Sequence, residues 1–236
     1  DFCLSRGLGD VYKRQLYLSG GGSNGDGMFV AHDLGLLFLH IPKTAGMSLR
    51  AGLKSISRDN HFDFPRMHIP AREFREIVGH NRWDKFYSFS IVRNPWEWTV
   101  SFYSFLKDSP EWLVLDKRWK DLTGDDWAYR FERLANGGLA YFLDEFDWSH
   151  YTPQTGMPIG KVGQLDWLNY PINRIYKIDE LGELSSDILK LTGKRLYIPH
   201  MNSSPHVHYR DYYTEQTKRR VEQLNEKLID QFEYTF

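Results

Sequence analysis

The stretch LLFLHIPKTAGMSLRAGL, Leu36–Leu53, decides the fold of this chain. It opens with an apolar run of the kind found in parallel strands that are buried on both faces. A Pro-Lys-Thr-Ala-Gly loop at 42–46 ends this run, and apolar residues with helical spacing follow it. The sequence therefore predicts a strand over 35–41, a tight loop, and a helix over 47–56.

Strands and helices alternate along the rest of the chain. The segments FYSFSIV at 86–92 and RIYKI at 174–178 are rich in aromatic and β-branched residues, so both are predicted strands. Helices are predicted over 71–78, 95–107, 125–136, 138–145 and 179–191, and as one continuous helix after Thr214. This alternation is typical of an α/β domain with a central parallel sheet flanked by helices. We expect one such domain over 28–236.

Residues 1–27 differ in character from the rest. The segment DFCLSRGLGDVYKRQ, 1–15, has neither helical nor strand periodicity, and a Gly- and Ser-rich stretch typical of a flexible linker follows it. We expect 1–27 to be a non-native or disordered leader, with a cloning or assembly artefact over 1–15 and Met28 as the natural start. An ordinary disordered tail is the other interpretation.

The composition of the 236 residues narrows the class of protein. A formal net charge of −1 gives no global attraction to nucleic acid or anionic membranes, and the sequence has no run of 18 apolar residues that would predict a membrane span. Cys3 is the only cysteine, which excludes an internal disulfide and a thiolate zinc site. We therefore expect a cytoplasmic protein without a nucleic-acid partner. An upstream anchor lost from the sequence would instead indicate a secretory compartment, and the oligomeric state is not predicted.

The loop between the first strand and its helix has the features of an anion site. Backbone N–H groups and the helix dipole attract a phosphate to such a helix start. Lys43 adds a positive charge, Thr44 and Ser48 add hydroxyl donors, and Gly46 permits close approach of the backbone. An ordinary turn with a solvated lysine is the alternative. Because the lysine precedes the glycine, this is not the G-x-x-x-x-G-K-[ST] loop of ATP- and GTP-hydrolysing proteins.

A second loop follows the strand predicted over 86–92. Arg93 stands at the end of that strand, and Asn94-Pro95 then opens a helix. Ser101 lies eight residues after Arg93, which is about two helical turns. A guanidinium fork and a hydroxyl together suit the oxygens of a phosphate. Either residue alone would more simply be an ordinary surface arginine or helix serine.

Together, HIPKTAG and the later VRNPW…S resemble the sulfotransferases that use 3′-phosphoadenosine 5′-phosphosulfate (PAPS). The likeness is closest to the branch that sulfates carbohydrates and to its bacterial relatives, and it extends from about Met28 to the C-terminus. It implies a P-loop-NTPase-like three-layer fold and PAPS as co-substrate, with no metal. It assigns the 5′-phosphosulfate to Lys43, Thr44, Ala45, Gly46, Met47 and Ser48, and the 3′-phosphate to Arg93 and Ser101. The family often has glycine and threonine where this chain has Ala45 and Met47.

The segment RMHIPAREF, 66–74, resembles the part of the same family in which a basic residue, a spacer, a histidine and a proline precede a helix. The resemblance implies that His68 is the general base and that Arg66 stabilises charge. His80, just before the second strand, is the alternative base. A histidine suits this role because its ordinary pKa lies near 7.

The sequence thus predicts transfer of the sulfuryl group of PAPS to an acceptor hydroxyl, with a carbohydrate as the candidate acceptor. Lys43 would neutralise the bridging oxygen during in-line transfer. One rival is a nucleotide kinase-like phosphotransferase, which would need ATP and Mg²⁺. A rival of another class is a catalytically silent nucleotide-binding module, which would bind the nucleotide without turnover.

Overall fold

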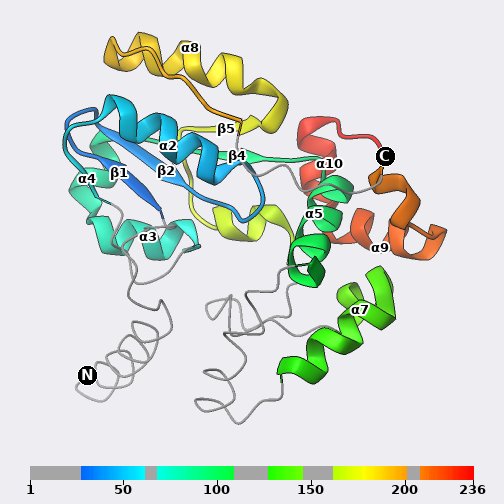
Figure 1. The fold of residues 1–236 in the computed structure, drawn as a ribbon. Coiled ribbons are helices and arrows are strands. Elements are labelled where there is room, and N and C mark those ends of the chain that lie inside the picture. Colours follow the sequence, from blue (N-terminus) through cyan, green and yellow to red (C-terminus); the bar gives the residue numbers. More distant parts are fainter. Residues whose placement is uncertain (1–27, 62–67, 109–126, 146–161, 201–207) are drawn as a thin grey trace.

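The computed structural model describes residues 28–61, 68–108, 127–145, 162–200 and 208–236. Five strands form one sheet in the order β3-β1-β2-β4-β5 (Figure 1). The strands are β1 (Phe29–Ala31), β2 (Leu36–Leu39), β3 (Asn60–His61), β4 (Tyr87–Val92) and β5 (Arg174–Lys177). The three strands predicted from the sequence, β2, β4 and β5, pair in parallel with β4 at their centre.

The prediction of a parallel sheet fails at one edge. β1 pairs antiparallel with β2 through a hairpin turn at 32–35, where Gly35 has the left-handed φ of 62°. β3 pairs antiparallel with β1. These added strands are three and two residues long. Segments that short carry no readable periodicity, which is why the sequence did not reveal them.

Eight helices lie in the described part of the chain. They are α2 (Gly46–Ile56), α3 (Ala71–Val78), α4 (His80–Lys85), α5 (Pro95–Asp108), α7 (Trp127–Asp144), α8 (Leu181–Thr192), α9 (Glu215–Leu224) and α10 (Glu226–Phe232), with 3₁₀ turns η2 (Gln164–Leu168), η3 (Ile178–Glu180) and η4 (Tyr209–Tyr212). The break predicted after residue 136 is a kink within α7, where Gly138 has φ 63° and ψ −159°. The six-residue α4 was not predicted.

The prediction of one continuous C-terminal helix was wrong. Thr214 caps α9 as expected, because its hydroxyl accepts from the Thr217 N–H. The helix then breaks at Asn225, which separates α9 from α10. The Asn225 Nδ2 group donates to the carbonyl of Val221 at 3.0 Å. Asparagine competes in this way with backbone hydrogen bonds, so it favours a helix end over a helix interior.

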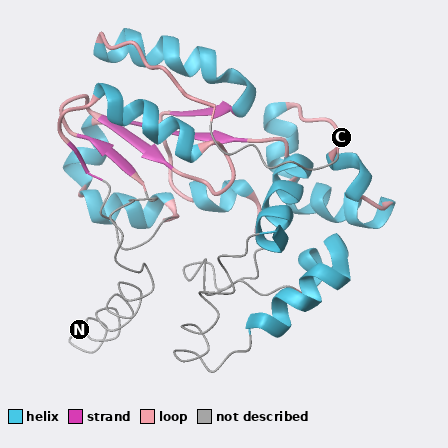
Figure 2. Cartoon of the chain, viewed as in Figure 1, coloured by secondary structure: helices cyan, strands magenta, loops and turns pink. Residues whose placement is uncertain are grey.

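Helices cover both faces of the sheet, as Figure 2 shows. Leu36 and Phe38 of β2 pack with apolar residues of α2 and α8. The alternate residues Leu37 and Leu39 pack with α3 and α4 on the opposite face. This alternation follows from the strand period of two. It accounts for the unbroken apolar run, since every residue of β2 is buried.

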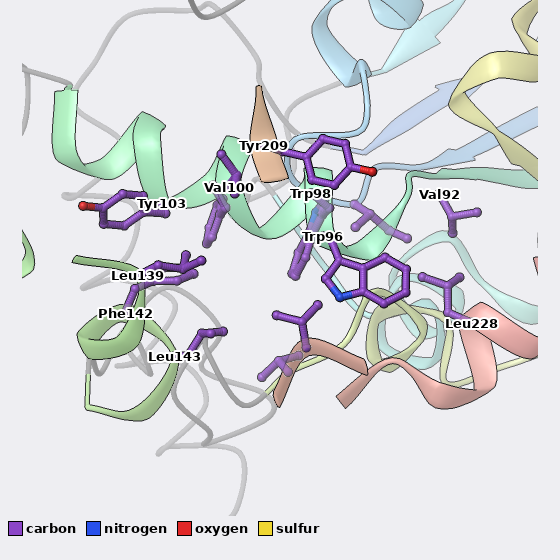
Figure 3. Close-up of a cluster of buried hydrophobic side chains, with 14 of the residues drawn as sticks. Val92, Trp96, Trp98, Val100, Tyr103, Leu139, Phe142, Leu143, Tyr209 and Leu228 are labelled. Carbon is purple, nitrogen blue, oxygen red and sulfur yellow. The ribbon is translucent and has the colours of Figure 1, made fainter. Parts of the chain in front are cut away.

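A third apolar cluster lies beyond the carboxyl ends of β2 and β4, where α5 meets α7, α9 and α10 (Figures 1 and 3). Trp96 and Trp98 of α5 are both buried in it. The indole Nε1 of Trp98 donates to the carbonyl of Pro42 at 2.7 Å. The packing of α5 therefore positions this helix directly against the loop that follows β2.

Candidate functional site

The loop between β2 and α2 has an unusual backbone. Lys43 and Ala45 both adopt left-handed conformations, with φ of 63° and 62°. Such a conformation costs an L-residue about 1–2 kcal/mol, so surrounding contacts must hold it. Inside the loop, the buried Thr44 hydroxyl donates to the carbonyl of Ile41 at 2.8 Å. From outside, Trp98 binds the carbonyl of Pro42.

Helix α2 begins at Gly46 with an uncapped N-terminus. Its N-cap residue, Ala45, supplies no side-chain hydrogen bond. The N–H groups and the dipole at a helix start of this kind favour an anion. Gly46 itself is required for a packing reason, because a Cβ atom at this position would overlap the His40 ring. Next to it, Met47 is partly exposed and Ser48 is buried.

Lys43 directs its ammonium group over the ring of Phe105, with 4.1 Å between Nζ and the ring centroid. Burial, and then the positive charge of Arg93, lower the pKa of Lys43 to about 8. Lys43 is therefore still mainly protonated at pH 7. No carboxylate forms an ion pair with it in the described ranges. The two cations act on one another at the same edge of the sheet.

Arg93 directly follows β4 and stands at the start of α5. Its Nε group donates to Glu97 Oε2 at 3.2 Å. The side chain of Asn94 caps the helix, since its Oδ1 accepts from the N–H groups of Trp96 and Glu97 at 3.1 and 3.3 Å. Pro95 occupies the first helical position, where its fixed φ is favourable. Local sequence thus determines where the Arg93 side chain emerges.

One face of α5 connects the two cationic residues. Glu97, Ser101 and Phe105 follow each other at intervals of four residues, so they form a row along the helix. Glu97 binds Arg93 at one end of the row, and the Phe105 ring contacts Lys43 at the other. The buried Ser101 lies between them. The row extends about 12 Å along the axis.

His68 lies against the residue before the first loop. Its Nδ1 is 3.1 Å from the carbonyl oxygen of His40, and the two rings meet edge to face with centroids 4.6 Å apart. A carbonyl only accepts, so Nδ1 carries the proton and Nε2 carries the lone pair of the neutral ring. Burial lowers the pKa of His68 to about 4; the bond to His40 opposes this shift, and the charges of Arg50 and Lys43 add to it. His68 is therefore neutral at pH 7.

His80, the alternative base, is not brought to this place. His80 is more than half exposed, and its Nε2 lies 3.0 Å from the carboxylate of Glu76. In the described part of the chain, none of its contacts joins it to Lys43 or His68. Arg66 lies outside the described residues. The structure therefore places His68, and not His80, beside the first loop.

Several residues near this site were not predicted from the sequence. The pairing of Glu97 with Arg93 could have been read from their spacing of four in a helix. Arg50 of α2 is buried, which is rare for an arginine, and its charge acts on His68. Gln164 forms two hydrogen bonds with the backbone of Arg93. Nothing near residue 164 in the sequence indicates that contact.

The described residues contain no group of three or more His, Cys, Asp or Glu side chains that could hold a metal ion. Nor does any helix among them combine the length and the apolar character needed to cross a bilayer.

No curated protein and no solved structure matches this chain significantly. The model of the sulfotransferase family matches residues 26–235, which includes both loops, α5 and the C-terminal helices. A match over that share of the sequence is decisive: the chain belongs to the sulfotransferase family.

Proposed function

We propose that this protein transfers the sulfuryl group of PAPS to an acceptor hydroxyl. Membership of the sulfotransferase family supports sulfuryl transfer in general. The observation on which the choice of donor rests is the pair Lys43 and Arg93. Two cations whose charges act on one another at the ends of adjacent parallel strands suit a ligand with an anionic group at each end. PAPS is such a ligand.

Each end of the donor has its own set of residues in this proposal. Lys43 and the backbone N–H groups of 44–48 bind the 5′-phosphosulfate at the start of α2. The Thr44 hydroxyl already donates to the carbonyl of Ile41, so Thr44 contributes to this site only through its backbone N–H group. Arg93 and Ser101 bind the 3′-phosphate. The strand-loop-helix unit of β2 and α2, with helices on both faces of the sheet, supports a P-loop-NTPase-like fold.

In this proposal, Lys43 and His68 have separate roles in the transfer step. Lys43 neutralises the negative charge that develops on the bridging oxygen as the S–O bond breaks. His68 accepts the proton of the acceptor hydroxyl at Nε2, while His40 keeps the other nitrogen protonated and the ring oriented. We assign the base to His68 because His80 is paired with Glu76. Arg66 remains a proposed charge-stabilising residue.

The proposals for the acceptor and for the compartment each rest on one feature of the sequence. The resemblance of the two loops to the carbohydrate branch and its bacterial relatives favours a carbohydrate hydroxyl. The absence of a second cysteine favours a reducing compartment, so we expect the enzyme to act in the cytoplasm.

A thermal-shift comparison tests the donor. We expect 3′,5′-bisphosphoadenosine to raise the melting temperature more than AMP or ATP at equal concentration, because only it engages both Lys43 and Arg93. A labelled-sulfate transfer screen over glycans, phenols and lipids then identifies the acceptor. Stabilisation by ATP with Mg²⁺ alone would favour the kinase rival. Binding of the bisphosphate with no transfer to any acceptor would favour the silent module.

A further inference from the structure

We propose that Gln164 is a positioning residue for the donor's 3′-phosphate, and that it acts by fixing the backbone of Arg93. This inference rests on the proposed function and deepens it. It assigns a role to a residue of η2 that is 71 positions from Arg93 in the sequence.

The contact uses both ends of one side-chain amide. The N–H of Arg93 donates to Gln164 Oε1 at 2.8 Å, and Gln164 Nε2 donates to the carbonyl of Arg93 at 2.7 Å. Gln164 is completely buried. The ladder between β4 and β5 ends at the pair Val92 and Lys177, so Arg93 is the first residue beyond it. The glutamine amide therefore pairs with Arg93 as one more strand residue would.

Fixing this backbone matters because of how arginine binds phosphate. A guanidinium recognises two phosphate oxygens only in the correct plane and direction. Glu97 engages Nε of Arg93, and the terminal nitrogens have no partner among the described residues. The direction of those nitrogens then depends on the backbone at residue 93. Removing the glutamine amide would leave the partly buried N–H and carbonyl of Arg93 unpaired, and the backbone could then rotate toward other partners.

The residue before Gln164 lies close to the C-terminal helices. The preceding Gly163 donates its N–H to Asp166 Oδ2 at 2.7 Å. A Cβ atom on Gly163 would lie 2.8 Å from the carbonyl oxygen of Leu224, at the break between α9 and α10. The segment that carries Gln164 is thus packed closely between this break and the end of β4.

The chain offers a matched control at the opposite end of β4. Asn173 Oδ1 accepts from the N–H and the hydroxyl of Ser88, at 2.7 and 2.8 Å. It is also a side-chain amide bound to the β4 backbone, but it does not touch Arg93. Asn173 is exposed, so its loss should weaken the fold less than the loss of Gln164, and it should leave phosphate recognition unchanged.

The experiment measures discrimination, not affinity alone. The dissociation constants of 3′,5′-bisphosphoadenosine and AMP are determined by calorimetry for wild type, Gln164→Leu and Asn173→Leu. Wild type should prefer the bisphosphate. Gln164→Leu should reduce this preference at least tenfold, with AMP affected far less, and Asn173→Leu should keep the wild-type preference. A merely structural role for Gln164 would lower both affinities together.

Other outcomes have equally definite meanings. An unchanged preference in folded Gln164→Leu, or an equal loss in Asn173→Leu, overturns the inference. A wild type without preference overturns the 3′-phosphate assignment itself, which is a separate failure. Should Gln164→Leu not fold, Gln164→Glu is used at several pH values beside wild type. Its preference should recover on acidification, because a protonated carboxyl can again donate to the Arg93 carbonyl. No recovery contradicts the inference.

Discussion

Lys43 combines a left-handed backbone with a partly buried ammonium group that lies over an aromatic ring. The left-handed backbone lowers the stability of the fold, and burial lowers the stability of the charged form. The aromatic face attracts the ammonium group, but no carboxylate in the described ranges forms an ion pair with it. Residues held at such a cost are concentrated at functional sites. His68 is the second residue of this kind, because burial keeps its ring neutral.

Replacing Lys43 by alanine should mainly reduce turnover. The substitution removes a charge that acts on the bridging oxygen as the bond breaks, and loss of one such group costs on the order of 10²–10³ in kcat. Steady-state kinetics with the acceptor found in the screen measures the effect. The exposed Lys54, at the end of α2, provides the control variant Lys54→Ala. Unchanged kcat in Lys43→Ala would remove the residue from this role.

The pH dependence of kcat/KM should have two limbs. Above a pKa of about 8, Lys43 loses its proton and the charge that neutralises the donor. Below a pKa of about 4, His68 gains a proton and can no longer act as a base. Activity should therefore be highest between these values. In Lys43→Arg the alkaline limb should disappear, since arginine stays protonated; an alkaline limb that persists there belongs to another group.

Asn94 caps the N-terminus of helix α5, and Trp98 fixes the position of the helix against the loop that follows β2. Asn94 caps the helix through Oδ1 and also donates Nδ2 to the carbonyl of Thr235 at 2.8 Å. Trp98 binds the helix to the loop before α2. The same helix bears the row Glu97, Ser101 and Phe105. Helix α5 therefore contacts both the loop that holds Lys43 and the residue Arg93.

Two substitutions at Asn94 should separate the cap from the second contact. Asn94→Asp keeps the capping oxygen and loses the donor to Thr235, whereas Asn94→Ala loses both. We expect Asn94→Ala to lower the free energy of unfolding by about 1 kcal/mol more than Asn94→Asp. Denaturant unfolding measures the difference. Equal losses would mean that the cap contributes nothing to α5.

Much of the molecule could be predicted because its signals are local. The strands β2 and β4, the helices that follow them, and the loop residues Lys43 and Arg93 are all contained in short contiguous segments. β1 and β3 could not be predicted, since neither is long enough to show a period. The contact between Gln164 and Arg93 depends on tertiary packing across 71 residues. A single sequence holds no signal for such a pair.

The free energy of unfolding of the whole domain should depend on pH in a way that reflects the burial of His68. Its pKa is about 4 in the folded protein and ordinarily 6.5, so below pH 6.5 the unfolded chain binds a proton that the folded chain does not. The free energy of unfolding should therefore fall as the pH drops from 6.5 toward 4. The effect amounts to a few kcal/mol at most, since one pKa unit corresponds to about 1.4 kcal/mol.

Comparing variants isolates this contribution from those of the carboxylates. His68→Gln should lack it, so the difference in unfolding free energy between wild type and this variant should shrink on acidification. The exposed His80→Gln serves as the control. A constant difference between wild type and His68→Gln from pH 7 to pH 4 would show that the His68 ring takes up a proton in the folded protein as readily as in the unfolded chain.

The row of side chains on α5 has a consequence for how donor choice can evolve. Glu97 and Phe105 belong to one rigid rod, so a drift of that rod displaces the contacts to both loops together. Under the proposed function, a descendant adapted to a shorter or longer activated sulfate would have to move this helix as well as the two loops. Donor length would then depend on the position of α5.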